Sequence, residues 1–178
     1  MNEIAVRRAV PADAAAIGAV HVASWRSTYA SILPDTYLTN LSARREAAYY
    51  EAAIRAGAGV FVAVAGETAR IIGFCTTGLG RSGGPGEGEI QTLYVLDDFR
   101  DQGAGRLLMR RAAAHLAGLG CGSVYLWVLN ENPARWFYSH LGGRAVQEKN
   151  VSWAGTKLRQ SAYLWEPVDV LLRKNLPA

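Results

Sequence analysis

The chain has 178 residues, of which 50% are hydrophobic and 19% are charged, and its formal net charge is +4. This composition excludes a disordered chain, and the length fits one domain spanning residues 1–178. The first residues lack the apolar core of a secretory signal, and no apolar run is long enough to cross a membrane. The two cysteines, Cys75 and Cys121, form neither a disulfide framework nor a metal-ligand pattern. We therefore expect a cytoplasmic protein without a metal or a membrane partner.

The expected elements alternate between strands and helices along the chain. Strands are expected at 3–9, 59–65, 70–78, 88–96, 123–129 and 159–166, and helices at 11–25, 42–57, 103–118 and 133–143. Pro11 and Ser42 are residue types that begin helices, and Gly57 is one that ends them. The nearly continuous apolar run at 123–129 is typical of a strand that is buried on both faces. This order predicts one mixed α/β domain.

A glycine-rich stretch, Gly78 to Gly88, contains "GLGRSG", which matches a dinucleotide-binding fingerprint. That fingerprint requires a helix to begin at its third glycine. Here the chain continues as "GPGEGE", which cannot begin a helix. We interpret the stretch as a connection between two strands.

Basic residues cluster at one place, the segment "FRDQGAGRLLMRR" from Phe99 to Arg111. Elsewhere acidic and basic residues are mixed, and no basic stripe alternates with aromatic residues, so nucleic acid is not an expected partner. Gly103 and Gly105 stand at the start of an amphipathic helix, where glycine costs about 1 kcal/mol against alanine. Glycine without a Cβ leaves the unpaired N–H groups of a helix start open to a phosphate. A tight strand-to-helix turn is the alternative reason for these glycines.

The spacing Arg100-x-x-Gly103-x-Gly105, after a strand and before an amphipathic helix, resembles motif A of the GNAT superfamily of N-acetyltransferases. The segment "YLWVLNENPARWFYSHLGG" is similar to motif B of that family, through Asn132, Phe137 and Tyr138. Its spacing is one residue tighter than usual, and Gly143 stands where the family usually has phenylalanine. The resemblance covers nearly the whole chain.

The resemblance implies a fold and a cosubstrate. The fold is a mixed, mostly antiparallel sheet of about seven strands flanked by helices, with a cleft between two splayed parallel central strands. The cosubstrate is acetyl-CoA, with its pyrophosphate on the turn from Arg100 to Arg106 and its pantetheine arm along the preceding strand. The implied binding residues are Leu93, Tyr94, Val95, Arg100, Gln102, Gly103, Ala104, Gly105, Arg106 and Asn132.

The family's chemistry is the direct attack of an amine on the thioester. Tyr138 matches the family tyrosine that protonates the leaving thiolate, and its alternative role is a buried aromatic residue of the short helix. Glu89 is the candidate general base, on a strand whose regular alternation would place it on one face with Gln91, Leu93 and Val95. A water chain is an equal alternative to Glu89.

The acceptor is expected to be a small-molecule or peptide amine. Trp25 and Tyr29 follow His21 at four-residue intervals, and near a helix end they suit the wall of an acceptor site. Aromatic walls favour an amine with an apolar or cationic body. The alternative is that this stripe is the core-facing side of the helix. An acyl-CoA sensor without catalysis, and a homodimer, are also compatible with the sequence.

Overall fold

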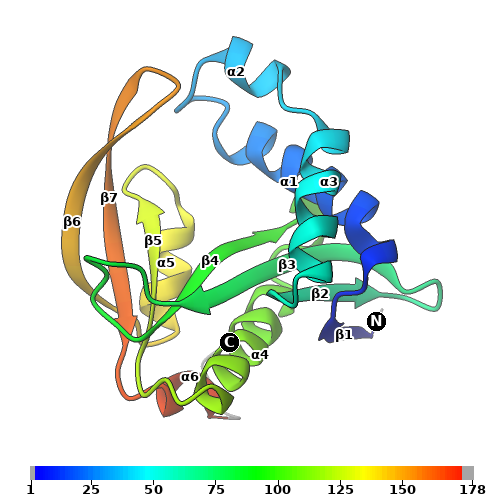
Figure 1. The fold of residues 1–178 in the computed structure, drawn as a ribbon. Coiled ribbons are helices and arrows are strands. Elements are labelled where there is room, and N and C mark those ends of the chain that lie inside the picture. Colours follow the sequence, from blue (N-terminus) through cyan, green and yellow to red (C-terminus); the bar gives the residue numbers. More distant parts are fainter. Residues whose placement is uncertain (1–2, 174–178) are drawn as a thin grey trace.

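One mixed sheet organises residues 3–173, which the computed structural model describes (Figure 1). Its seven strands in this part of the chain are β1 (Ile4–Arg8), β2 (Gly59–Ala65), β3 (Arg70–Leu79), β4 (Gly88–Val95), β5 (Val124–Leu129), β6 (Arg144–Trp153) and β7 (Thr156–Trp165). They lie in the order β1-β2-β3-β4-β5-β7-β6, and only the β4–β5 pair is parallel. The expected fold class is confirmed.

Helices cover both faces of the sheet. On one face lie α1 (Ala14–Thr28) and α3 (Ala43–Arg55), with the short α2 (Asp35–Thr39) between them in sequence; on the other lie α4 (Ala104–Gly118), α5 (Ala134–His140) and α6 (Asp169–Leu172). Alternate residues of β2 show the division, because Phe61 and Ala63 join the core beneath α4, whereas Val60 and Val62 pack with residues of α1 and α3. None of the helices in residues 3–173 is long and apolar enough to cross a membrane.

The helix boundaries follow the local signals in the sequence. The Oγ of Ser42 accepts a hydrogen bond from the Arg45 N–H at 3.3 Å, and Gly57 adopts a left-handed φ of +85° after α3 ends. Gly103 caps α4 with a φ of +88°, which a residue with a side chain rarely adopts. A single 3₁₀ turn, Pro11–Asp13, precedes α1, which continues three residues beyond the predicted helix.

Three elements, β6, α2 and α6, were not expected from the sequence, and β7 begins at Thr156 rather than at residue 159. Strand β6 is exposed along nearly its whole length, so it lacks the alternation of apolar and polar residues that marks a half-buried strand. Its structure depends on pairing with β7, an interaction that no local pattern reports. The two helices span only five and four residues.

The glycine-rich stretch is the connection between β3 and β4, and no helix begins at Gly83, so the interpretation against a dinucleotide site is confirmed. A Cβ at Gly84 would lie 2.1 Å from the hydroxyl of Tyr125. Glycine is therefore needed here so that the loop can pack directly on β5.

Candidate active site

The central feature of the site is a gap in the sheet between β4 and β5. The two strands pair only at Gly88–Val124 and Glu89–Tyr125. Just beyond, Thr92 pairs with Thr76 while Ile90 pairs with Thr77, so Gln91 is an extra residue in β4. Such a bulge bends a strand and increases its twist. The strands diverge after it (Figure 1). A cavity of about 420 Å³ lies there, lined by residues of both strands.

Peptide groups of β4 remain unpaired along this gap. The N–H of Leu96, just after β4, donates to the carbonyl of Ile72 in β3 at 2.9 Å. Because peptide groups alternate in direction along a strand, those of Leu93 and Val95 are directed away from β3 and toward β5. An extended ligand could therefore hydrogen-bond to Leu93 and Val95 as another strand would.

The bulge also corrects the expected faces of β4. Leu93 and Val95 pack against the core beneath α4, whereas Tyr94 packs in the cluster of Val62 and Phe74 on the opposite face. Before the bulge, Ile90 lies in the α4 core. Its neighbour Glu89 therefore points to the face of Tyr94, so the expectation that Glu89 shares a face with Leu93 and Val95 is wrong. The extra residue Gln91 shifts the alternation by one position.

The start of α4 has the properties of an anion site. The first bond within the helix runs from the Leu107 N–H to the Gly103 carbonyl at 3.1 Å, so the N–H groups of Ala104, Gly105 and Arg106 precede it. A Cβ at Gly103 would meet no atom within 4 Å. The Nε of Arg106 is buried without a hydrogen-bond partner among the described residues, which points to a missing acceptor.

Gly105 has a second reason to be glycine. A Cβ there would lie 3.1 Å from the Phe137 ring of α5. The packing of α5 on α4 therefore requires a small residue at this position. The tight-turn alternative applies to Gly103, with its left-handed backbone, more than to Gly105.

Arg100 and Gln102 have contacts within the protein. The Arg100 guanidinium pairs with Asp97 at 2.7 Å and donates to the hydroxyl of Thr28 at 3.1 Å. The Gln102 amide donates to the backbone carbonyl of Asp98 at 2.8 Å. These bonds hold the loop before α4, and Arg100 connects that loop to the end of α1.

Tyr138 lines the cavity from α5, and its ring packs against Tyr163 and Trp165. Its hydroxyl has no hydrogen-bond partner in the described part of the chain. Burial, together with the nearby Tyr29, raises the pKa of Tyr138. The phenol is therefore protonated around neutral pH and can donate a hydrogen bond into the cavity.

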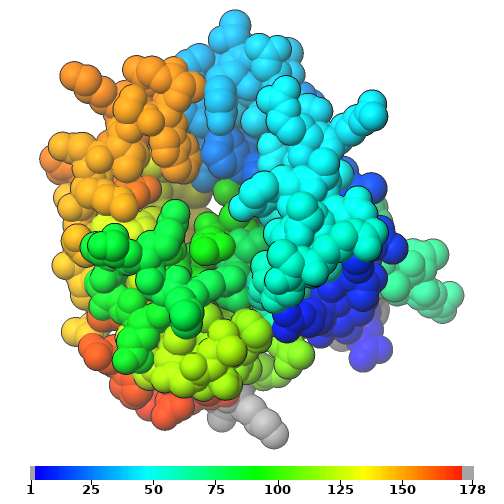
Figure 2. Space-filling model, in the orientation of Figure 1, coloured from blue at the N-terminus to red at the C-terminus, as the bar shows by residue number. Residues whose placement is uncertain are grey.

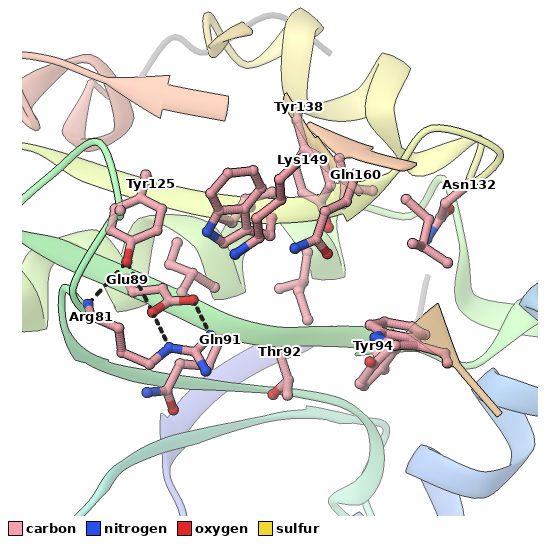
Figure 3. A pocket seen from close by; sticks show the side chains of 18 of the residues that line it. Arg81, Glu89, Gln91, Thr92, Tyr94, Tyr125, Asn132, Tyr138, Lys149 and Gln160 are labelled. Atoms are coloured by element: carbon pink, nitrogen blue, oxygen red, sulfur yellow. Dashed lines mark hydrogen bonds and ion pairs between the residues drawn. The ribbon is translucent and has the colours of Figure 1, made fainter. Parts of the chain in front are cut away.

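Glu89 is only 1% exposed, and its carboxylate is held by three hydrogen bonds. Arg81 of the β3–β4 connection donates from Nε at 2.8 Å and from Nη2 at 2.6 Å, and the Tyr125 hydroxyl donates at 3.1 Å (Figure 3). The Glu89 carboxylate raises the pKa of the Arg81 guanidinium. Since a carboxylate has about four acceptor positions, roughly one remains free.

Asn132 is 9% exposed and lines the cavity. Its side-chain oxygen accepts a hydrogen bond from the N–H of Ala134 at 2.9 Å. That bond holds the start of α5, so the side-chain amide N–H groups are the part of Asn132 available to a ligand.

The aromatic residues predicted to lie on one face of the first helix do not all line the cavity. Tyr29 lines the cavity, whereas Trp25 does not and instead stacks on Trp153 of β6 with ring centroids 5.5 Å apart. His21 lies deeper, bonded to the Tyr50 hydroxyl at 2.8 Å, and burial lowers the pKa of its imidazole. His21 thus takes the core-facing alternative.

Several residues of the cavity were not identified from the sequence: Arg81, Tyr125, Trp127, Lys149, Trp153 and Gln160. Arg81 lies within the glycine-rich stretch, whose match to a dinucleotide fingerprint gives no role to the arginine. The β6–β7 hairpin, which carries Lys149, Trp153 and Gln160, borders one side of a hollow that the β3–β4 connection and helices α1–α3 border on the other sides (Figure 2). In residues 3–173, no cluster of His, Cys, Asp or Glu side chains is arranged to hold a metal ion.

Comparisons with known proteins agree with this geometry. Residues 22–142 match the model of the acetyltransferase (GNAT) family. The chain is 35% identical over 169 residues to the uncharacterized N-acetyltransferase YuaI of Bacillus subtilis, covering 94% of this chain and 96% of that protein.

Two solved structures share the fold. YncA from Salmonella typhimurium, solved with its cofactor acetyl-CoA, is 21% identical and has a TM-score of 0.70, covering 99% of this chain and 98% of its own. The PaiA N-acetyltransferase of Thermoplasma acidophilum, in complex with coenzyme A, is 17% identical with a TM-score of 0.66, covering 89% and 98%. At these identities the likeness concerns the fold.

Proposed function

The chain belongs to the GNAT family of acetyltransferases, and we propose that it transfers the acetyl group of acetyl-CoA directly to a primary amine in the gap between β4 and β5. Its family membership makes it an N-acetyltransferase, as the two sequence motifs predicted. The residues that bind the two substrates and move protons are the subject of the proposal.

The donor fits the face of the sheet that α4 covers. The N–H groups of Ala104, Gly105 and Arg106 would hold the pyrophosphate, together with the Nε of Arg106, which lacks a partner in the described part of the chain. The open peptide groups of Leu93 and Val95, the residues on either side of Tyr94, would bind the pantetheine arm. Asn132 would contribute its amide from the opposite side of the gap. These groups are hydrogen-bond donors or strand-like edges, which is the chemistry that this donor requires.

Acetyl-CoA supplies a thioester whose carbonyl an amine can attack and whose sulfur leaves as a thiolate. The N–H of Val95 points into the gap, where it would stabilise the oxygen that becomes negative during attack. The amine would approach from the opposite face of the sheet, where Tyr29, Tyr94 and Glu89 line the cavity.

Tyr138 would donate the proton to the leaving sulfur. Its hydroxyl faces the cavity without an acceptor in residues 3–173, and its raised pKa keeps it in the donating form. The Tyr138 ring is fixed by Tyr163 and Trp165, so the hydroxyl needs little reorganisation before it acts.

Glu89 would take the proton from the ammonium form of the acceptor, either directly or through a water molecule. The carboxylate is paired with Arg81 and accepts from Tyr125, and about one of its acceptor positions is free. Tyr125 and Arg81 orient it, so it cannot rotate away from the cavity. A water chain without Glu89 is the alternative.

The single observation that carries this proposal is the Tyr138 hydroxyl, which has no partner among the described residues, in a gap whose edge on β4 has open peptide groups. Isothermal titration with acetyl-CoA tests donor binding, with a DNA duplex as the control for binding by charge alone. Release of free thiol across a panel of amines tests transfer. Donor binding without thiol release from any amine would make the protein an acyl-CoA sensor and would reject the proposed reaction.

A further inference from the structure

The charged side chains that line the cavity are Arg81, Glu89 and Lys149. Arg81 and Glu89 neutralise each other through two hydrogen bonds of 2.8 and 2.6 Å. Lys149 has no ion-pair partner within residues 3–173. The cavity therefore carries one uncompensated positive charge, and it lies on the β6–β7 hairpin.

The Lys149 ammonium is held at the cavity by an aromatic ring. Its Nζ lies 3.9 Å from the centroid of the Trp127 ring on β5. A cation at this distance over an indole face is attracted to it, while the aliphatic stem packs on apolar surface. The N–H groups that do not face the ring remain free to bind a ligand.

Gln160 stands beside Lys149, because the two residues are directly opposite each other in the β6–β7 register (Figure 3). Gln160 is only 8% exposed, and its side-chain amide has no hydrogen-bond partner among the described residues. Because Gln160 lines the cavity, its amide can donate to a ligand there.

An ammonium and an amide on neighbouring strands offer donors to two oxygens at once. A carboxylate has two such oxygens and forms short, charge-assisted hydrogen bonds with these groups. A second amine on the acceptor would instead be repelled by Lys149. The rings of Tyr29, Trp127 and Trp153 line the same cavity and suit an apolar or aromatic side chain.

We infer that Lys149 and Gln160 form a carboxylate subsite, and that the acceptor is a free amino acid or a similarly small amine bearing one carboxylate. This inference rests on the proposed function, since it names the acceptor of that reaction. The positive charge of Lys149 beside the aromatic wall selects against polyamines, because it would repel their additional ammonium groups.

The test compares two acceptors that differ only in the carboxylate, L-phenylalanine and phenethylamine. Each is titrated into enzyme saturated with coenzyme A, so that binding is measured without turnover. We expect L-phenylalanine to bind about tenfold or more tightly, which corresponds to one charge-assisted hydrogen bond. Lys149→Gln should remove this preference, Lys149→Arg should keep most of it, and Gln160→Leu should reduce it severalfold.

Lys157→Gln is the matched control, because Lys157 is an exposed lysine of β7 that does not line the cavity. It should bind both compounds as the parent does, and all variants should keep the parent's affinity for coenzyme A. Equal affinity for the two compounds, no binding of either, tighter binding of spermidine, or an unchanged preference in Lys149→Gln would each overturn the subsite.

Thiol release separates this inference from the proposed function. If L-phenylalanine binds through Lys149 but releases no thiol, the subsite stands and the proposed transfer to the bound acceptor fails. If phenethylamine is acetylated with the same kcat/KM as L-phenylalanine, the transfer stands and the carboxylate subsite is rejected.

Discussion

The two sides of the β4–β5 gap are built in different ways. The side beneath α4 comes mostly from one continuous segment, Leu93 to Arg106, with Asn132 and Tyr138 added from the next strand and helix. The opposite side takes Tyr29 from the end of α1, Arg81 from the β3–β4 connection, and Lys149 and Gln160 from the β6–β7 hairpin.

This difference follows from what each side would bind. A pyrophosphate and an extended amide chain can be bound by backbone N–H groups, which one strand, one turn and one helix start provide together. A particular amine must be recognised by side chains, and these converge from segments far apart in the sequence. Variation in the acceptor side can therefore change specificity while the donor side stays the same.

The largest expected effect is on the donor side alone. Gly105→Glu places a carboxylate where the pyrophosphate would bind, and loss of two charge-assisted hydrogen bonds lowers affinity by about a hundredfold or more. Titration with acetyl-CoA measures it. Gly105→Ala is the control, because its Cβ, 3.1 Å from Phe137, needs only a small shift of that ring. Parental affinity in Gly105→Glu would show that the glycine serves helix packing only.

Tyr138→Phe tests general acid catalysis in the gap between the donor side and the acceptor side. We expect turnover to fall by about tenfold to a thousandfold, the size of general acid effects, while affinity for acetyl-CoA stays unchanged. The melting temperature should change little, because the hydroxyl has no partner within residues 3–173 that would be left unpaired. Unchanged turnover would mean that water or another group protonates the thiolate.

Glu89→Gln tests the acceptor side for base catalysis. We expect kcat/KM to fall by roughly tenfold, with the larger loss at low pH, where more of the acceptor is protonated and must lose a proton. Glutamine retains the shape of the side chain and one acceptor oxygen for Arg81. The control is Glu87→Gln, in the same connection but outside the cavity lining. A pH profile with the parent's shape would remove Glu89 from the mechanism.

Trp25→Ala gives the smallest expected effect on activity, because Trp25 acts through the residues that it supports. Its ring stacks on Trp153 and lies 4.8 Å from the Tyr29 ring, edge-on. We expect the acceptor KM to rise severalfold with acetyl-CoA affinity intact, and Trp25→Phe to restore most of the loss. Urea unfolding of the variant measures the packing cost, about 3 kcal/mol. Loss of both ligands together would place Trp25 in the core and the acceptor wall elsewhere.

The sequence by itself predicted most of the fold, and it indicated the segment proposed to bind the donor. The start of α4 could be predicted because glycine at the beginning of an apolar helix reduces helix stability. Only an unusual backbone conformation or the close approach of another group explains glycine at such a position. The same segment then carried the family resemblance, which the family match confirmed. Tyr138 and Asn132 followed from the second motif, and their roles stay predictions.

Tertiary structure decided the acceptor side and the gap. The run "GEIQTLYV" reads as a regular strand, and only its pairing with β3 places an extra residue at Gln91, separates the faces of Glu89 and Leu93, and ends the contact with β5. Strand β6 is exposed on both faces, so no hydrophobic periodicity predicted it. The position of Lys149 opposite Gln160 depends on the pairing of β6 with β7, which the sequence did not indicate. Local patterns report burial and backbone preference, whereas register between distant strands depends on which partners the folded sheet brings together.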